Sequence, residues 1–192
     1  MKKIILIGAG GHSKSCIDVI ESEKKYKIVC LVDKDIKNNK IYNYPIVTED
    51  IDHDLLLKKS KNILITVGHI KNGHIREKLF KKYKKLGFKF PIIISPESHV
   101  SKYAKINEGT IIMHHSIINS SSVIGSNCII NNKSLIEHDV VIGDHCHIST
   151  SAVINGNVKM GNNVFIGSNA TIVNSVNIKS NSFVRANELI KK

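Results

Sequence analysis

The residues best suited to chemistry lie in one short stretch, Ser134–Ser149, which holds three of the ten histidines of the chain. His138 is followed directly by Asp139, and His145 and His147 come soon after. An imidazole titrates near neutrality, so it can accept or donate a proton at physiological pH, and clustered histidines can also bind zinc. The residue types alone leave proton transfer and metal binding open.

A second candidate stretch is the glycine turn Gly8–His12, which follows the apolar run Lys2–Ile7. A strand that turns through glycines into a helix presents backbone N–H groups to an anion. Ser13 replaces the third glycine of the dinucleotide fingerprint, so NAD binding is a weak prediction. Asp33 closes the next apolar run, Lys27–Val32, at the position where recognition of a ribose or base is expected.

In the first half of the chain, strands alternate with helices, which is typical of a parallel sheet of Rossmann type. Apolar residues at helical spacing and a terminal glycine indicate the helices. The predicted strands are Lys2–Ile7, Lys27–Val32, Ile63–Val67 and Phe90–Ile94, and the predicted helices are Ser13–Glu21 and Ile75–Leu86.

The second half has a different period, because every sixth residue is aliphatic from Val100 onward without a slip. The fourth residue after each aliphatic position is small or of modest size. The fifteen aliphatic positions are Val100, Ile106, Ile112, Ile118, Ile124, Ile130, Ile136, Ile142, Ile148, Ile154, Met160, Ile166, Ile172, Ile178 and Val184.

This six-residue repeat predicts a triangular coil, in which three short strands and three corners complete one turn every 18 residues. The aliphatic residues stack inside, and only small side chains fit at the other inward position. Asn and Gly at the corners tolerate left-handed backbone conformations. Cys128 and Cys146 are 18 residues apart, so we expect both to be free thiols in the core rather than nucleophiles or a disulfide.

The formal charge of +12 is compatible with nucleic acid, an anionic membrane surface or phosphate-bearing ligands. The chain has no Trp and little interleaving of aromatic with basic residues, so nucleic-acid binding is not expected. No apolar run is long enough to span a bilayer, so membrane insertion is not expected either. The apolar start is too short for a signal peptide, so we expect the protein in the cytoplasm. The four cysteines form no CxxC pair, and in that compartment we expect them to be free thiols.

Two motifs together resemble a known family. The stretch Ser134–Ser149 is similar to the signature of the bacterial sialic-acid/amino-sugar acetyltransferases (PglD/NeuD type), and Ile7–His12 is similar to their sugar-nucleotide loop. The resemblance implies an α/β Rossmann-like nucleotide-sugar-binding domain over residues 1–95. It further implies an all-β left-handed parallel β-helix that binds acetyl-CoA over residues 96–192. Members are typically homotrimers with active sites between neighbouring β-helices.

The resemblance also implies roles for individual residues. His138, at an outward corner, is the general base that takes the proton from the sugar amine, and Asp139 holds its imidazole. Gly156, one coil further on, leaves room beside the histidine, and its N–H contacts the acetyl carbonyl. Further acetyl-CoA contacts fall on His147 and Ser168. The contacts to the nucleotide sugar fall on Gly10, Gly11, His12 and Asp33.

The resulting prediction is an acetyl-CoA-dependent N-acetyltransferase that acts on a nucleotide-linked amino sugar of the UDP-4-amino type for surface glycan synthesis. His12 favours this branch of the family, and a metal site is not expected. One alternative is O-acetylation of sialic acid or a related sugar by the same fold. Another is a non-catalytic β-helix scaffold, because the chain ends at Arg185–Lys192, where members of the family continue over the cofactor.

Overall fold

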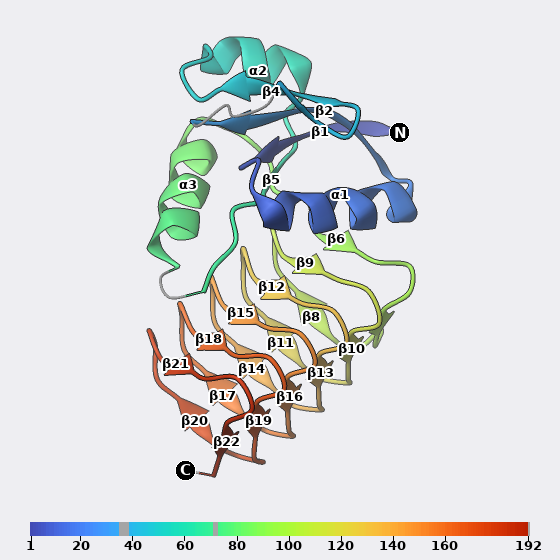
Figure 1. The fold of residues 1–192 in the computed structure, drawn as a ribbon. Coiled ribbons are helices and arrows are strands. Elements are labelled where there is room, and N and C mark those ends of the chain that lie inside the picture. Colours follow the sequence, from blue (N-terminus) through green and yellow to red (C-terminus); the bar gives the residue numbers. More distant parts are fainter. Residues whose placement is uncertain (35–38, 71–72, 192) are drawn as a thin grey trace. The chain divides into compact units, whose positions relative to one another are not determined.

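The computed structural model describes residues 1–34, 39–70 and 73–191, and the chain divides into two compact units, each with its own core (Figure 1). The first unit comprises Met1–Gly68 and Ile75–Pro91. The second comprises Ile92–Lys192 together with the short segment His69–His74.

The first unit is an α/β domain built on a five-stranded sheet with the strand order β3-β4-β2-β1-β5. All neighbouring strands run parallel except β3 and β4, which are antiparallel, so the expected Rossmann-type sheet is confirmed. Its strands are β1 (Lys2–Ile7), β2 (Tyr26–Asp33), β3 (Lys40–Ile41), β4 (Tyr44–Thr48) and β5 (Ile63–Ile65), and its helices are α1 (Gly11–Glu23), α2 (His53–Lys59) and α3 (His74–Lys85).

The helices of this unit bury one face and leave charged residues outside. In α3, Phe80, Tyr83 and Arg76 are buried, whereas the lysines of the helix are at least partly exposed. The Arg76 guanidinium is buried as well, and it donates hydrogen bonds to the carbonyl oxygens of Ile65 and Val67. The elements β3, β4 and α2 were not predicted from the sequence, because their apolar stretches are short. No helix in the described part of the chain is long and apolar enough to cross a membrane.

The second unit is a left-handed parallel β-helix of three sheets built from two-residue strands (Figure 1). The first sheet contains β7 (His99–Val100), β10 (Ile117–Ile118), β13 (Leu135–Ile136), β16 (Val153–Ile154), β19 (Thr171–Ile172) and β22 (Leu189–Ile190). The second contains β8 (Lys105–Ile106), β11 (Val123–Ile124), β14 (Val141–Ile142), β17 (Lys159–Met160) and β20 (Asn177–Ile178). The third contains β6 (Ile93–Ile94), β9 (Ile111–Ile112), β12 (Ile129–Ile130), β15 (His147–Ile148), β18 (Phe165–Ile166) and β21 (Phe183–Val184).

The six-residue repeat places every aliphatic position at the second residue of a strand, inside the column. Ile136 pairs with Ile154, which pairs with Ile172, so residues 18 apart stack as predicted. The predicted strand Phe90–Ile94 is wrong as a member of the α/β sheet, because Ile93–Ile94 pairs with β9 of the β-helix. Ile94 lies six residues before Val100 and therefore starts the repeat.

The small residues that lie four positions after each aliphatic residue also point inward. Many of them donate hydrogen bonds to backbone carbonyls. Thr110 Oγ1 donates to Gly125 O over 2.7 Å, and Cys128 Sγ donates to Gly143 O over 3.2 Å. These bonds stabilise corner carbonyls that would otherwise be buried without a partner. Both cysteines of the column, Cys128 and Cys146, are buried and free, as expected.

The left-handed backbone conformation recurs at the third residue after each aliphatic position, with φ between +55° and +64° from His115 to Asn187. Asn is the most frequent residue there, in line with its tolerance of this conformation. We expected the corner glycines to adopt this left-handed conformation as well, and for Gly125 and Gly143 this is wrong. Each lies two residues before the left-handed position and does not have a positive φ. A Cβ at Gly125 would lie 2.5 Å from the carbonyl carbon of Gly143, so close approach between coils requires these glycines.

Candidate active site

His138 and Asp139 form an exposed pair at the corner between β13 and β14. The His138 Nδ1 atom lies 2.8 Å from Asp139 Oδ2, and the two side chains are 62% and 57% exposed. Because an ionised carboxylate only accepts, this bond places the imidazole proton on Nδ1 and leaves Nε2 as an acceptor. Asp139 has a φ of +60°, the left-handed conformation that recurs at the corners from His115 to Asn187.

The other side of the imidazole faces Gly156, one coil further along the column. A Cβ at position 156 would lie 2.8 Å from both Cε1 and Nε2 of His138. The two corners are joined by the backbone hydrogen bond from Asn157 N to His138 O, 3.0 Å long. Glycine at this position therefore lets the imidazole lie against the next corner, as expected from the 18-residue spacing.

The backbone amide of Gly156 differs from its equivalents at the corners that follow β11 and β14. At the corners after β11 and β14, the corresponding amides donate to side chains of the next coil. Ser126 N donates to Asp144 Oδ1 over 2.7 Å, and Asp144 N donates to Asn162 Oδ1 over 2.8 Å. Among the described residues, no acceptor binds the amide of buried Gly156. Unlike those two amides, the Gly156 N–H is therefore not held by a side chain of the next coil.

A second carboxylate lies next to the histidine in sequence. Glu137 Oε2 accepts a hydrogen bond from Asn119 Nδ2 over 2.9 Å, and the side chain of Glu137 is half-buried. Glu137 was not among the site residues predicted from the sequence. The available signal was the 18-residue spacing that stacks Asn119 on Glu137.

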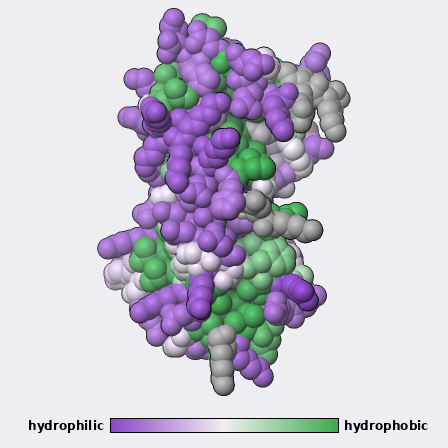
Figure 2. Space-filling model, turned by 90° about the vertical axis from the view of Figure 1, so that its left-hand side faces the viewer, coloured by the Kyte–Doolittle hydropathy of each residue, from purple (hydrophilic) through white to green (hydrophobic). Residues whose placement is uncertain are grey.

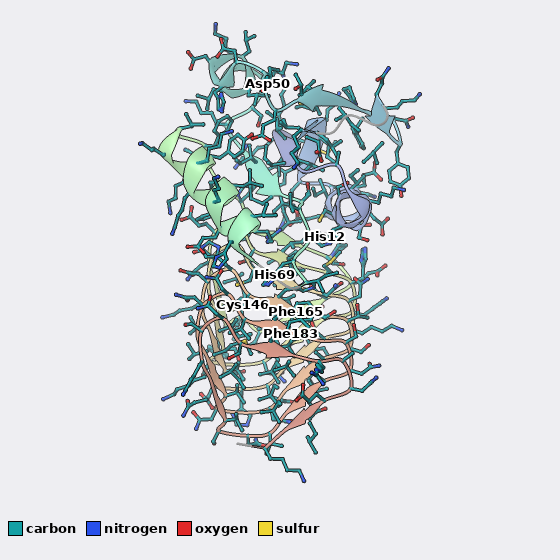
Figure 3. The ribbon with its side chains drawn as sticks, turned by 60° about the vertical axis from the view of Figure 1, so that its left-hand side comes forward. His12, Asp50, His69, Cys146, Phe165 and Phe183 are labelled. Atoms are coloured by element: carbon teal, nitrogen blue, oxygen red, sulfur yellow. The ribbon has the colours of Figure 1, made fainter. Side chains whose placement is uncertain are left out.

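His147, the expected acetyl-CoA contact, lies on the outer face of β15 and is buried. Its Nδ1 is 2.5 Å from the carbonyl oxygen of His69, and its Nε2 is 3.2 Å from Asn131 Nδ2. The ring packs edge-on against Phe165, with ring centroids 5.2 Å apart. Phe165 and Phe183 continue this ring column along the third sheet (Figure 3). The segment containing His69 thus covers His147 within the second unit.

The remaining candidate residues of the β-helix, Ser168 and His145, lie at other corners than His138. Ser168 lies at a half-buried corner, where its hydroxyl is 3.0 Å from the hydroxyl of Ser149. His145 is buried with Nδ1 2.9 Å from Asn127 Nδ2. In the described ranges of the chain, no three His, Cys, Asp or Glu side chains converge as metal ligands.

The glycine turn of the α/β unit has the expected strand–turn–helix geometry. Gly8 has a φ of +112°, and Gly10 is the N-terminal cap of α1. Among the described residues, nothing beyond the adjoining backbone lies within 4 Å of a Cβ built on Gly10 or Gly11, and both glycines are exposed, so a ligand can approach the backbone there. Ser13 Oγ donates to Gly10 O over 2.6 Å, which explains why a serine can replace the third glycine.

Two side chains frame this turn. Asp33 Oδ2 accepts a hydrogen bond from Ala9 N over 2.6 Å, so the aspartate holds the turn itself. His12 Nε2 lies 3.4 Å from Cys16 Sγ on the next turn of α1. Burial raises the pKa of the Cys16 thiol to about 12, so the sulfur remains protonated at neutral pH.

These features define a β-helix with an exposed histidine–aspartate pair and an α/β domain whose glycine turn is suited to binding phosphate groups. The family models agree with both parts. The model described as the PglD N-terminal domain matches residues 3–83, and the model described as bacterial transferase hexapeptide (six repeats) matches residues 121–156. Both parts of the chain thus match the PglD/NeuD-type left-handed β-helix acetyltransferases.

Solved structures agree with this assignment along the whole chain. PerB, the perosamine N-acetyltransferase of Caulobacter crescentus solved with CoA and GDP-perosamine, is 25% identical with a TM-score of 0.92. The match covers 100% of this chain and 90% of that protein. The acetyltransferase domain of PglB from Neisseria gonorrhoeae is 28% identical, with a TM-score of 0.88 and coverages of 100% and 92%. No curated protein sequence is significantly similar to the chain.

Proposed function

We propose that this acetyl-CoA-dependent sugar acetyltransferase transfers its acetyl group to the amine of a nucleotide-linked amino sugar. The observation that carries the proposal is the imidazole of His138, which is held by Asp139 on one side and lies against the backbone of Gly156 on the other. A general base and an oxyanion donor in one place are what acyl transfer to an amine requires.

The proposed reaction uses each of these groups once. The neutral amine attacks the thioester carbonyl while His138 Nε2 takes the proton that the nitrogen loses. The carbonyl oxygen becomes an oxyanion, which the Gly156 N–H stabilises by a hydrogen bond. The tetrahedral intermediate then expels the CoA thiolate, which takes up a proton, and the products are the acetamido sugar and CoA. His147 and Ser168 would contact acetyl-CoA.

The glycine turn supplies the nucleotide end of the proposed substrate site. The exposed amides at the start of α1 and the absence of side chains at Gly10 and Gly11 suit a diphosphate. His12 and Asp33 would contact the nucleotide sugar, Asp33 also by holding the turn through Ala9 N. We propose UDP as the nucleotide of the substrate. Because PerB was solved with GDP-perosamine, a GDP-linked amino sugar should be tested beside the UDP-linked one.

A homotrimer forms part of the proposal. On the outer face of the first sheet, Ile117, 41% exposed, is followed by half-buried Leu135 and Val153. Thr171 and then Leu189, which is 52% exposed, complete this mostly apolar row. The His138 corner adjoins this sheet directly after β13. Packing of this row against neighbouring copies would cover apolar surface and enclose the exposed histidine.

The proposed function is tested by supplying acetyl-CoA with UDP- or GDP-linked amino sugars and identifying the product by NMR. We expect release of CoA and an amide-linked acetyl group. An ester on a sialic acid, formed while amino sugars remain unmodified, would establish the O-acetyltransferase instead. No binding of CoA at millimolar concentration, measured by calorimetry, would favour the non-catalytic scaffold.

A further inference from the structure

The positive charge of the chain is concentrated in its α/β half. Residues 1–91 contain twenty Lys and Arg against ten Asp and Glu, whereas residues 92–192 contain eight against six. The α/β half therefore carries +10 of the formal charge of +12. The visible face of this unit is mostly hydrophilic (Figure 2).

Within the unit, six exposed lysines line the edge at which the parallel strands begin. Lys3 pairs with Lys27 across β1 and β2, and Lys2 N donates to Lys25 O over 3.1 Å. The row continues past β1, because Lys89 N donates to Lys61 O over 2.8 Å beside the start of β5. We define the lysine rim as Lys2, Lys3, Lys25, Lys27, Lys61 and Lys89, all of which are exposed.

Most lysines of the rim have no carboxylate partner in the described part of the chain. Of its six lysines, only Lys25 forms an ion pair within the described ranges, with Glu23 Oε1 at 2.8 Å. Neighbouring strands lie about 5 Å apart, so these like charges are close enough to repel one another. The helix dipole explains lysines in the last turns of α2 and α3, but it does not explain lysines at the starts of strands. An external polyanion would relieve this repulsion.

Further features of the same edge favour a lipid surface over nucleic acid. The C-terminal cap of α2 reaches the rim, because Ser60 Oγ donates to Lys3 O over 2.8 Å. Leu86, directly after α3, is 36% exposed beside Lys84 and Lys85. Lysines with an exposed apolar side chain are typical of peripheral membrane binding. Single-strand binding instead uses several stacked aromatic residues, whereas the aromatic residue between Lys25 and Lys27, Tyr26, is half-buried.

We propose that the lysine rim docks the protein peripherally on an anionic phospholipid bilayer. The rim lies at the start of β1, and the glycine turn follows the end of the same strand. Docking by the rim therefore leaves the glycine turn at the far edge of the sheet, open to a soluble nucleotide. The attraction is electrostatic, so it weakens as ionic strength rises.

The test is co-sedimentation of the full chain with vesicles of phosphatidylcholine alone or with 30–40% phosphatidylglycerol, a composition on the order of that found in anionic membranes. The rim variant replaces Lys2, Lys3, Lys27, Lys61 and Lys89 with Gln. The control variant replaces five β-helix lysines with Gln and so removes the same charge: Lys102, Lys105, Lys133, Lys159 and Lys179. Circular dichroism melting verifies that each variant is folded, and a Lys2→Gln, Lys3→Gln double variant serves if the fivefold rim variant is not.

We expect the wild type to bind only the anionic vesicles, the rim variant to bind at least about tenfold more weakly, and the control variant to bind within about twofold of the wild type. The double variant should show an intermediate loss. Absence of wild-type binding, or equal losses in the rim and control variants, would overturn the proposal. Tighter binding to a single-stranded oligonucleotide than to the anionic vesicles, lost in the rim variant, would also overturn it and assign the rim to nucleic acid.

Discussion

The imidazole of His138 lies against the backbone of Gly156, eighteen residues further along the chain and one coil further along the column. A Cβ on Gly156 would lie 2.8 Å from two atoms of the ring. The contact involves the movable end of a side chain rather than backbone. A methyl group added here should therefore displace the histidine and leave the column intact.

The first prediction follows from this contact. Gly156→Ala should lower kcat/KM at least about tenfold, because the His138 imidazole is displaced from its position beside the Gly156 N–H. The melting temperature should change little. Gly143→Ala is the matched comparison, since its Cβ would lie 2.7 Å from the carbonyl of Gly161 and must disturb the backbone. Activity and thermal melting of the two variants are compared side by side. A Gly156→Ala enzyme with wild-type activity would show that the contact between His138 and Gly156 is not needed for acetyl transfer.

The second prediction concerns the interior of the column. Ile154 is fully buried between Ile136 and Ile172, so Ile154→Ala should lower the free energy of unfolding by about 2–5 kcal/mol. Val141→Ala, on the outer face and 40% exposed, should cost less than about 1 kcal/mol. Urea titration of both variants measures the difference. Equal losses would mean that residue 154 does not lie in a packed interior.

How much of this fold could be predicted depended on the length of each pattern. The six-residue repeat recurs so often that the strand positions and the stacking of Ile136 on Ile154 followed from the sequence. The short elements β3, β4 and α2 carry no comparable period and were missed. The start of the column at Ile94 was also missed. The apolar run Phe90–Ile94 is compatible both with a strand of a Rossmann-type sheet and with a strand of the hexapeptide repeat, so its composition does not distinguish the two.

Prediction of the candidate site divided along similar lines. The 18-residue period was sufficient to predict that Gly156 lies beside His138. The burial of His147 did not follow from the sequence, since it results from the segment at His69, 78 residues away in the chain. The part played by Asp33 in holding Ala9 N likewise depends on how β2 pairs with β1.

The third prediction is an alkaline loss of stability linked to Cys16. Burial raises the pKa of this thiol from an ordinary 9.0 to about 12. Below pH 9 the thiol is protonated in both states, whereas between pH 9 and 12 only the unfolded chain releases the proton. The free energy of unfolding should therefore fall in this window by about 1.4 kcal/mol per pH unit for this group.

Urea unfolding of wild type and Cys16→Ala at several pH values, with a reductant present, measures this contribution. The variant should show the shallower decline above pH 9, because the other titrating groups are common to both proteins. Parallel curves for the two proteins would mean that Cys16 is not protonated in the fold at high pH.

The most direct measurement of the central claim is kcat/KM for acetyl transfer by wild type and His138→Ala, with Asp139→Asn as the companion variant. Because the His138 side chain is 62% exposed, its removal should leave the melting temperature unchanged. We predict a fall of about 10²–10⁴-fold for His138→Ala. Asparagine tolerates the left-handed backbone at position 139, so Asp139→Asn should fold normally and show a smaller fall. Equal kcat/KM for wild type and His138→Ala would contradict the assignment of His138 as the general base.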